Sequence, residues 1–130
     1  APSIARQWDG ATDEQLLDAP LLHLEQRFRP RFDWNQWFEH FGVTPPKRLG
    51  GYSSSDYSLI IQAAMEGHGL AIGWLHLVQD LIAEGRLQQV GTGSVATDHP
   101  ITVLTRSERT GPATAAFVEW LLATAPGRPT

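Results

Sequence analysis

The sequence contains no cysteine and almost no lysine, and each of these absences excludes a class of protein. Without cysteine the chain cannot form a disulfide-stabilised scaffold, a thiolate metal site or a thiol nucleophile. Basic residues number 10 against 14 acidic residues, so the formal net charge is −4. A nucleic-acid-binding surface needs clustered lysine and arginine to displace counterions from the phosphate backbone. We therefore expect that this segment does not itself contact DNA.

The sequence also lacks a long apolar run and a secretory leader pattern. No stretch approaches the roughly 18 apolar residues that a membrane span requires, so we expect no membrane partner. Residues 1–6 do not have the basic-then-apolar order of a signal peptide, and the first residue is not methionine. We expect the natural gene product to begin upstream of Ala1, with a cytoplasmic location as the default.

What is present predicts one folded α/β domain. Apolar residues make up 42% of the chain and charged residues 18%, a balance typical of globular proteins with a hydrophobic core. The patterning predicts helices over 13–17, 34–41, 57–66, 75–84 and from 111 onward, and strands over 21–24, 48–53, 70–74 and 100–105. Two helix starts, Thr12 with Gln15 and Asp33 with Gln36, have the spacing of capping boxes. Regular alternation of strand and helix predicts a parallel or mixed sheet covered by helices.

This architecture also predicts where a ligand would bind. In open α/β sheets, ligands lie beyond the carboxyl ends of the strands, next to helix N-termini. That rule selects the segments 25–34 and 52–57. The candidate binding residues at these two strand ends are Glu25, Gln26, Trp34, Tyr52, Ser53 and Ser55.

Each group of candidates has a structural alternative. The serines at 53–55 could bind an anion together with helix N-terminal amides, but plain helix capping by these serines or Asp56 is the favoured interpretation. Five aromatic residues could form a cage for a cation: Trp34, Trp37, Tyr52, Tyr57 and Trp74. Of these, Trp34 is the best pocket candidate, whereas Trp37 and Trp74 are expected in the core. The arginines at 27, 29 and 31 could clamp a carboxylate or phosphate, although a solvated loop is the favoured alternative.

Catalysis and metal binding find no support in the sequence. The five histidines have no zinc-ligand spacing, and His23, inside an apolar strand, is expected to be a hydrogen-bonded core residue. No serine lies in a nucleophile elbow, and no carboxylate pair marks a cleft. We therefore expect a protein that is not an enzyme and that needs no cofactor or metal.

An ordered set of residues between positions 52 and 90 carries a family resemblance. Gln62-Ala63-Ala64 is followed by Gly67, Gly69 and the apolar residues 70–73, and then by Gly85-Arg86-Leu87. This order resembles the effector-binding domain of LysR-type transcription regulators, in which a helix ending Gln-Ala-Ala-x-x-Gly-x-Gly precedes a short apolar strand. The segments 20–23 (Pro-Leu-Leu-His), 33–37 (Asp-Trp-x-x-Trp) and 117–121 (Phe-x-x-Trp-Leu) are similar to the glycine-cleavage-activator-like branch of that family.

The resemblance implies a periplasmic-binding-protein-like type 2 fold with two lobes. Residues 1–98 resemble the second lobe, and residues 99–130 resemble the strand and C-terminal helix that return to the first lobe. The winged helix-turn-helix of the family has no counterpart here, so DNA contact is not assigned to any residue of this chain. The implied function is sensing of a small-molecule effector, with homo-oligomers formed through the effector domains. A solute-binding protein of a transport system, which shares this fold, is the alternative, and the sequence upstream of Ala1 discriminates the two.

Overall fold

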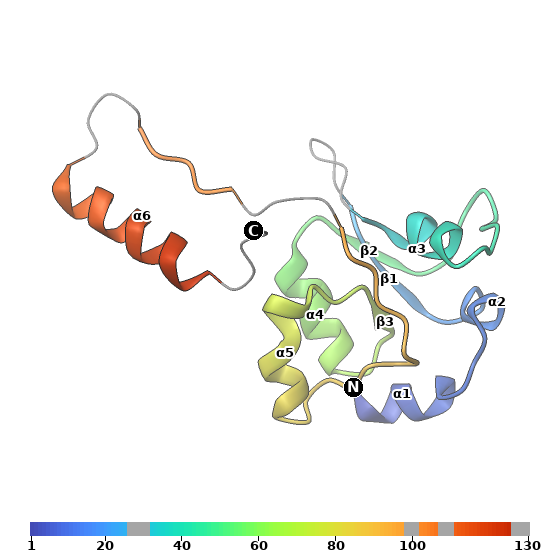
Figure 1. The fold of residues 1–130 in the computed structure, drawn as a ribbon. Helices are drawn as coiled ribbons and strands as arrows, with labels where there is room; N and C mark the ends of the chain where they lie inside the picture. Colours follow the sequence, from blue (N-terminus) through green and yellow to red (C-terminus); the bar gives the residue numbers. More distant parts are fainter. Residues whose placement is uncertain (26–31, 98–101, 107–110, 126–130) are drawn as a thin grey trace. The chain divides into compact units, whose positions relative to one another are not determined.

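The chain divides into two units, Ala1–Thr97 and Asp98–Thr130, in a computed structural model (Figure 1). The structure describes residues 1–25, 32–97, 102–106 and 111–125. The first unit contains a small sheet with helices around it. The described residues of the second unit, 102–106 and 111–125, include one helix.

Three short parallel strands form the sheet of the first unit: β1 (Leu21–Leu24), β2 (Tyr52–Ser54) and β3 (Leu70–Ala71). The strand order is β2-β1-β3, with β1 in the middle (Figure 1). Both pairings are parallel, and Leu22 is in register with Tyr52 on one side and Ala71 on the other. A parallel pair needs a crossover connection, and helices supply these connections here. The predicted α/β class with a parallel sheet is confirmed.

The helices of the first unit are α1 (Pro2–Trp8), α2 (Asp13–Leu16), α3 (Trp34–His40), α4 (Tyr57–Met65) and α5 (Leu75–Ala83). Both predicted capping boxes are present. The Thr12 hydroxyl accepts from the Gln15 amide at 3.3 Å, and the Asp33 carboxylate accepts from the Gln36 amide at 2.9 Å. The sequence reading gave no expectation for α1.

Alternation along β1 places two apolar layers on opposite faces of the sheet. Leu21 belongs to a cluster with Phe38 of α3 and Leu16 of α2. Its neighbour Leu22 belongs to a separate cluster with Ile60 and Ala64 of α4, together with partly buried hydrophobic residues around it. Successive side chains of a strand point to opposite faces, so a single strand serves both clusters. The first unit is therefore a sheet with α2 and α3 on one face and α4 on the other (Figure 1).

Two glycines allow the outer strands to approach β1. Gly51 has φ +128°, and a Cβ atom built there would overlap the carbonyl oxygen of Leu21. A Cβ atom at Gly69 would overlap the carbonyl oxygen of Pro20, which accepts a hydrogen bond from the Leu70 amide at 2.8 Å. Only glycine fits where one backbone comes this close to another.

Two predicted strands are shorter in the structure. The strand predicted over 48–53 is β2 at 52–54, because pairing with β1 begins at Tyr52, which lies opposite Leu22. The strand predicted over 70–74 ends at Ala71. Beyond that point the Tyr57 hydroxyl, rather than a strand, contacts the Ile72 carbonyl and the Trp74 amide.

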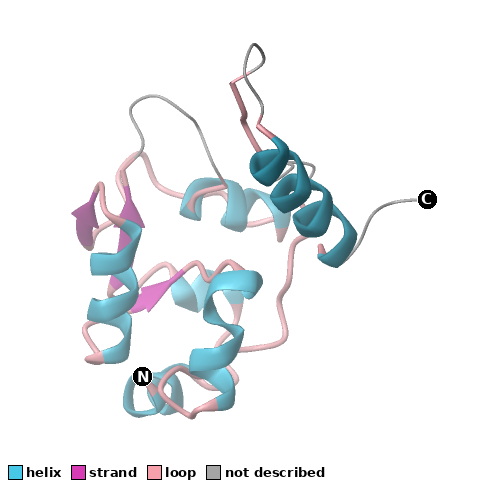
Figure 2. Cartoon of the chain, turned by 90° about the vertical axis from the view of Figure 1, so that its left-hand side faces the viewer, coloured by secondary structure: helices cyan, strands magenta, loops and turns pink. Residues whose placement is uncertain are grey.

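The second unit corrects two further expectations. Residues 102–105 lie in the strand predicted over 100–105, but they form no strand, because strand backbone groups need a neighbouring strand as partner. Helix α6 (Pro112–Thr124) is present, as Figure 2 shows. No residue of α6 is buried: of its expected core face (Ala113, Ala116, Phe117, Trp120 and Leu121), only Leu121 is even partly covered. Among the helices of the described residues, none combines the length and hydropathy of a membrane span.

Candidate functional site

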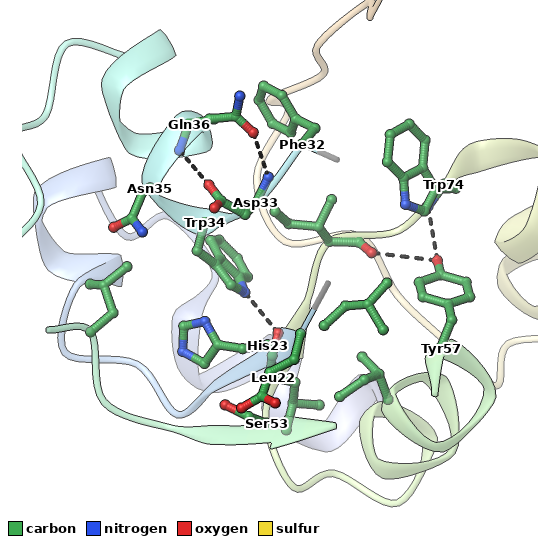
Figure 3. Close-up of a pocket in the computed structure, with 15 residues that line it drawn as sticks. Leu22, His23, Phe32, Asp33, Trp34, Asn35, Gln36, Ser53, Tyr57 and Trp74 are labelled. Atoms are coloured by element: carbon green, nitrogen blue, oxygen red, sulfur yellow. Dashed lines mark hydrogen bonds between the residues drawn. The ribbon is translucent and has the colours of Figure 1, made fainter. Parts of the chain in front are cut away.

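A cavity of about 510 Å³ lies where β1 and β2 end and α3 and α4 begin (Figure 3). Its lining residues come from these four strand and helix ends, from the loop before β2 and from the segment between β3 and α5. They are Leu22, His23, Leu24, Glu25, Phe32, Asp33, Trp34, Asn35, Gln36, Leu49, Ser53, Tyr57, Ile60, Ile72 and Trp74. The cavity is therefore at the sheet edge that the alternation of strands and helices selects for a ligand.

The two strand ends at this edge are held together by the backbone. The Glu25 amide donates to the Ser54 carbonyl oxygen at 2.8 Å, which continues the β1–β2 ladder by one bond. His23 is in register with Ser53, and both residues line the cavity. The His23 ring nitrogen Nε2 donates to the Gly50 carbonyl at 2.9 Å, so this histidine is hydrogen-bonded, as predicted. It is half-buried at the cavity and does not lie in the core, where it was expected.

Trp34 forms an apolar wall of the cavity. Its side chain is buried and stacks on Phe38, with ring centroids 5.7 Å apart. Its indole Nε1 donates to the Leu22 carbonyl at 2.9 Å (Figure 3). Because an indole has only this one donor, Trp34 can offer a ligand its ring surface but no hydrogen bond.

Several polar groups around the cavity keep hydrogen-bonding capacity. Asp33 and Gln36 use one carboxylate oxygen and the amide oxygen in their capping box, which leaves the Gln36 amide nitrogen. Within the described part of the chain, the side chains of Glu25, Asn35 and Ser53 have no hydrogen-bond partner. A ligand that enters the cavity therefore meets acceptors at Glu25 and both donors and acceptors at Asn35 and Ser53.

Tyr57 and Trp74 close the cavity on the side of α4 and α5. The Tyr57 hydroxyl accepts from the Trp74 backbone amide at 3.0 Å and donates to the Ile72 carbonyl at 3.4 Å (Figure 3). Burial raises the pKa of the Tyr57 hydroxyl, and the hydrogen bond from the Trp74 backbone offsets part of that rise. The hydroxyl therefore keeps its proton at neutral pH and can act as donor and acceptor at once.

The structure brings together three of the six predicted binding residues, Glu25, Trp34 and Ser53. Tyr52 is 56% exposed and lies outside the cavity lining, and so does the exposed Ser55. Gln26 and the arginines at 27, 29 and 31 lie outside the described residues.

The serine run has a clear division of roles. The Asp56 carboxylate caps α4 by accepting from the Ser58 amide at 2.8 Å, and the Ser54 hydroxyl accepts from the Asp56 amide at 3.1 Å. Helix capping therefore uses Asp56 and Ser54 and leaves the hydroxyls of Ser53 and Ser55 outside the capping contacts.

The sequence placed Tyr57 in a selected segment, 52–57, and among the aromatic residues of a possible cage, but not among the six candidate binding residues. It placed Trp74 in the core, whereas Trp74 lines the cavity. Tyr57 follows the N-cap Asp56 directly, and the first turn of a helix at a strand end is where binding residues gather. Trp74 gave no such indication, because it ends an apolar run that predicts a fully buried strand. His23 and Asn35 were likewise not selected, although both flank residues that were.

A second cavity of about 310 Å³ lies beside β3 and is mainly apolar, with Ile4, Val78, Leu87 and Val90 among its lining residues. Trp37 also lines it, packed against Phe41 at 4.9 Å between ring centroids. The Trp37 indole nitrogen is buried and has no hydrogen-bond partner among the described residues. Among all described residues of the chain, no group of three histidine or acidic side chains could hold a metal ion.

Comparison with known proteins gives the family. Residues 4–126 match the sequence model of the LysR substrate binding domain. Over 91 residues the chain is 34% identical to the HTH-type transcriptional regulator DsdC of Escherichia coli (strain K12). This aligned region covers 68% of this chain and 29% of DsdC.

A solved structure gives the fold. The AmpR effector binding domain from Citrobacter freundii superposes with a TM-score of 0.69 at 22% identity, covering 95% of this chain and 59% of that one. The predicted periplasmic-binding-protein-like type 2 fold is thereby confirmed. The chain spans less than a third of the length of DsdC, and it belongs to the LysR substrate-binding domain family.

Proposed function

We propose that the full-length protein is a LysR-type transcription regulator, and that this chain forms one wall of its effector site. One observation carries the proposal: a chain of this family has a cavity with free polar groups at the carboxyl ends of its parallel strands. A binding role fits this site better than catalysis, because the polar groups do not form a nucleophile with an adjacent base. The similarity to DsdC, a transcriptional regulator, favours this function over a solute-binding protein.

Six residues are proposed as effector contacts: Glu25, Gln26, Trp34, Tyr52, Ser53 and Ser55. Ser53 and Ser55 would donate hydrogen bonds to the effector, since neither hydroxyl takes part in capping α4. Trp34 would supply an apolar surface, because its indole nitrogen is bonded to Leu22. Tyr52 and Ser55 lie outside the cavity, so they would contact an effector only where it extends past the end of β2.

The proposed mechanism is closure of two lobes on the effector. Residues 1–98 would be the second lobe, and residues 99–130 would return to the first lobe. The effector shifts the protein between two arrangements only as far as its affinity for them differs. DNA contact would come from an N-terminal region of the full-length protein, and homo-oligomers would form through the effector domains in the cytoplasm. The segments at 20–23, 33–37 and 117–121 support membership of the glycine-cleavage-activator-like branch.

A ligand screen followed by matched variants tests this function. A thermal-shift screen of the full-length protein would use small carboxylates, amino acids and quaternary amines. For the compound with the largest shift, we expect Ser53→Ala to weaken binding about tenfold, the value of one good hydrogen bond to a ligand. Ser58→Ala, on the exposed side of α4, is the control and should leave the dissociation constant unchanged. Equal affinity of both variants and the parent protein would refute the assignment of the cavity.

A further inference from the structure

One side chain joins the first turn of α4 to the segment between β3 and α5. Tyr57 is the first residue of α4, and it is half-buried. Its hydroxyl contacts the Ile72 carbonyl and the Trp74 amide, two backbone groups that directly follow the end of β3. The hydroxyl thus supplies one acceptor and one donor to this segment, as the backbone of a neighbouring strand would do in a β-sheet.

The segment held in this way also starts α5. Trp74 is the N-cap residue of α5 and makes no side-chain capping bond. The same residue contributes its ring to the cavity wall, where Figure 3 shows it on the side of Tyr57. The position of the Trp74 ring and the start of α5 are therefore both set by backbone atoms that the Tyr57 hydroxyl holds.

We propose that Tyr57 is a positioning residue of the effector cavity, whose hydroxyl fixes the 72–74 segment and so couples the Trp74 wall of the cavity to the start of α5. The inference rests on the proposed function of the cavity, but it assigns a role to a residue outside the six proposed contacts. Tyr57 touches the ligand space as well, because it lines the cavity and its oxygen keeps a second lone pair.

The alternative is that Tyr57 only stabilises the fold. The two roles predict different patterns of amide exchange. A general stabiliser protects the whole sheet, so its loss would raise exchange at Leu70, whose amide bonds to Pro20 at 2.8 Å. A positioning residue protects the Trp74 amide alone, since the Tyr57 hydroxyl is the acceptor for that amide.

Hydrogen exchange in the full-length protein separates these patterns. Tyr57→Phe removes the hydroxyl and keeps the ring, and we expect the Trp74 amide to exchange at least about tenfold faster while Leu70 is unchanged. Tyr52→Phe is the matched control for this measurement, because Tyr52 is the other tyrosine of the chain and its side chain is exposed. An equal rise at Leu70 and Trp74, or no rise at either, would overturn the proposal.

A double-mutant cycle then tests the link to the cavity. With the compound of largest thermal shift, we expect Tyr57→Phe to weaken binding severalfold, and this effect to disappear in a Trp74→Ala background. Independent effects of the two substitutions would show that Tyr57 does not act through Trp74. If Ser53→Ala leaves binding unchanged, the proposed effector site is refuted. The exchange rates of the Trp74 and Leu70 amides still decide whether Tyr57 holds the 72–74 segment.

Discussion

Helices α4 and α6 are both rich in apolar residues, but only α4 buries any of them. Helix α4 buries Ile60, Ile61 and Ala64 and contacts all three strands of the sheet. Helix α6 is longer and has no buried residue. Its Phe117 and Trp120 side chains are 57% and 58% exposed, with ring centroids 5.7 Å apart. Apolar composition thus shows that a helix needs a partner surface, but the sheet that supplies this surface decides which helix is buried.

Replacing an aromatic residue should change the free energy of unfolding very differently in the two units, and this is the largest difference that we expect. Phe38 is fully buried, so Phe38→Ala should lower the free energy of unfolding by about 3–5 kcal/mol. Phe117→Ala in the same 130-residue chain should change it by less than about 0.5 kcal/mol, because Phe117 is exposed. Urea unfolding of the two variants measures both values.

The full-length protein provides the sharper version of this test. There we expect Phe117→Ala to cost about 3 kcal/mol, because the rest of the proposed first lobe would cover α6. A value near zero in the full-length protein would mean that this face of α6 stays exposed.

A smaller difference is expected for two glycines. Gly51→Ala should destabilise the chain by at least about 2 kcal/mol, since the residue combines φ +128° with an overlap at the Leu21 carbonyl oxygen. Gly111→Ala, at the N-cap of α6, meets no atom within 4 Å and should cost at most about 0.5 kcal/mol, the difference between glycine and alanine as N-cap residues. Thermal unfolding of the pair checks the order. Similar melting temperatures would show that β2 does not depend on the close approach to β1.

The smallest effects concern the helix caps. Asp33→Ala removes the capping box of α3 and should cost about 1 kcal/mol. Helix α6 begins at Gly111 without a side-chain cap, so Gly111→Asp should stabilise it by a few tenths of a kcal/mol. The first change is measured by urea unfolding and the second by helix content from circular dichroism. A loss at Gly111→Asp would contradict the assigned start of α6.

Local signals in the sequence predicted the helix starts well. Thr12 with Gln15 and Asp33 with Gln36 form their capping boxes because donor and acceptor lie within four residues. The order of strands and helices from α2 to α5 also followed from periodicity, and that order predicted a ligand site at the ends of β1 and β2.

Features that depend on distant partners could not be predicted in this way. Residues 102–105 alternate like a strand, but no neighbouring strand pairs with them among the described residues. Directly after β3, the Ile72 carbonyl accepts a hydrogen bond from the Tyr57 hydroxyl, which lies 15 residues away in the sequence. The Trp74 amide donates to the same Tyr57 hydroxyl, and Trp74 lines the cavity. The apolar run 70–74 alone could not show this position, because it contains no information about Tyr57.

The central claim is that an effector binds in the cavity at the carboxyl ends of β1 and β2. The most direct measurement is a chemical-shift titration of the isotope-labelled full-length protein with the compound of largest thermal shift. We expect the largest changes at the amides of Glu25, Ser53 and Trp74, which surround this cavity. Changes confined to Val78 and Leu87, beside the second, apolar cavity, would contradict it.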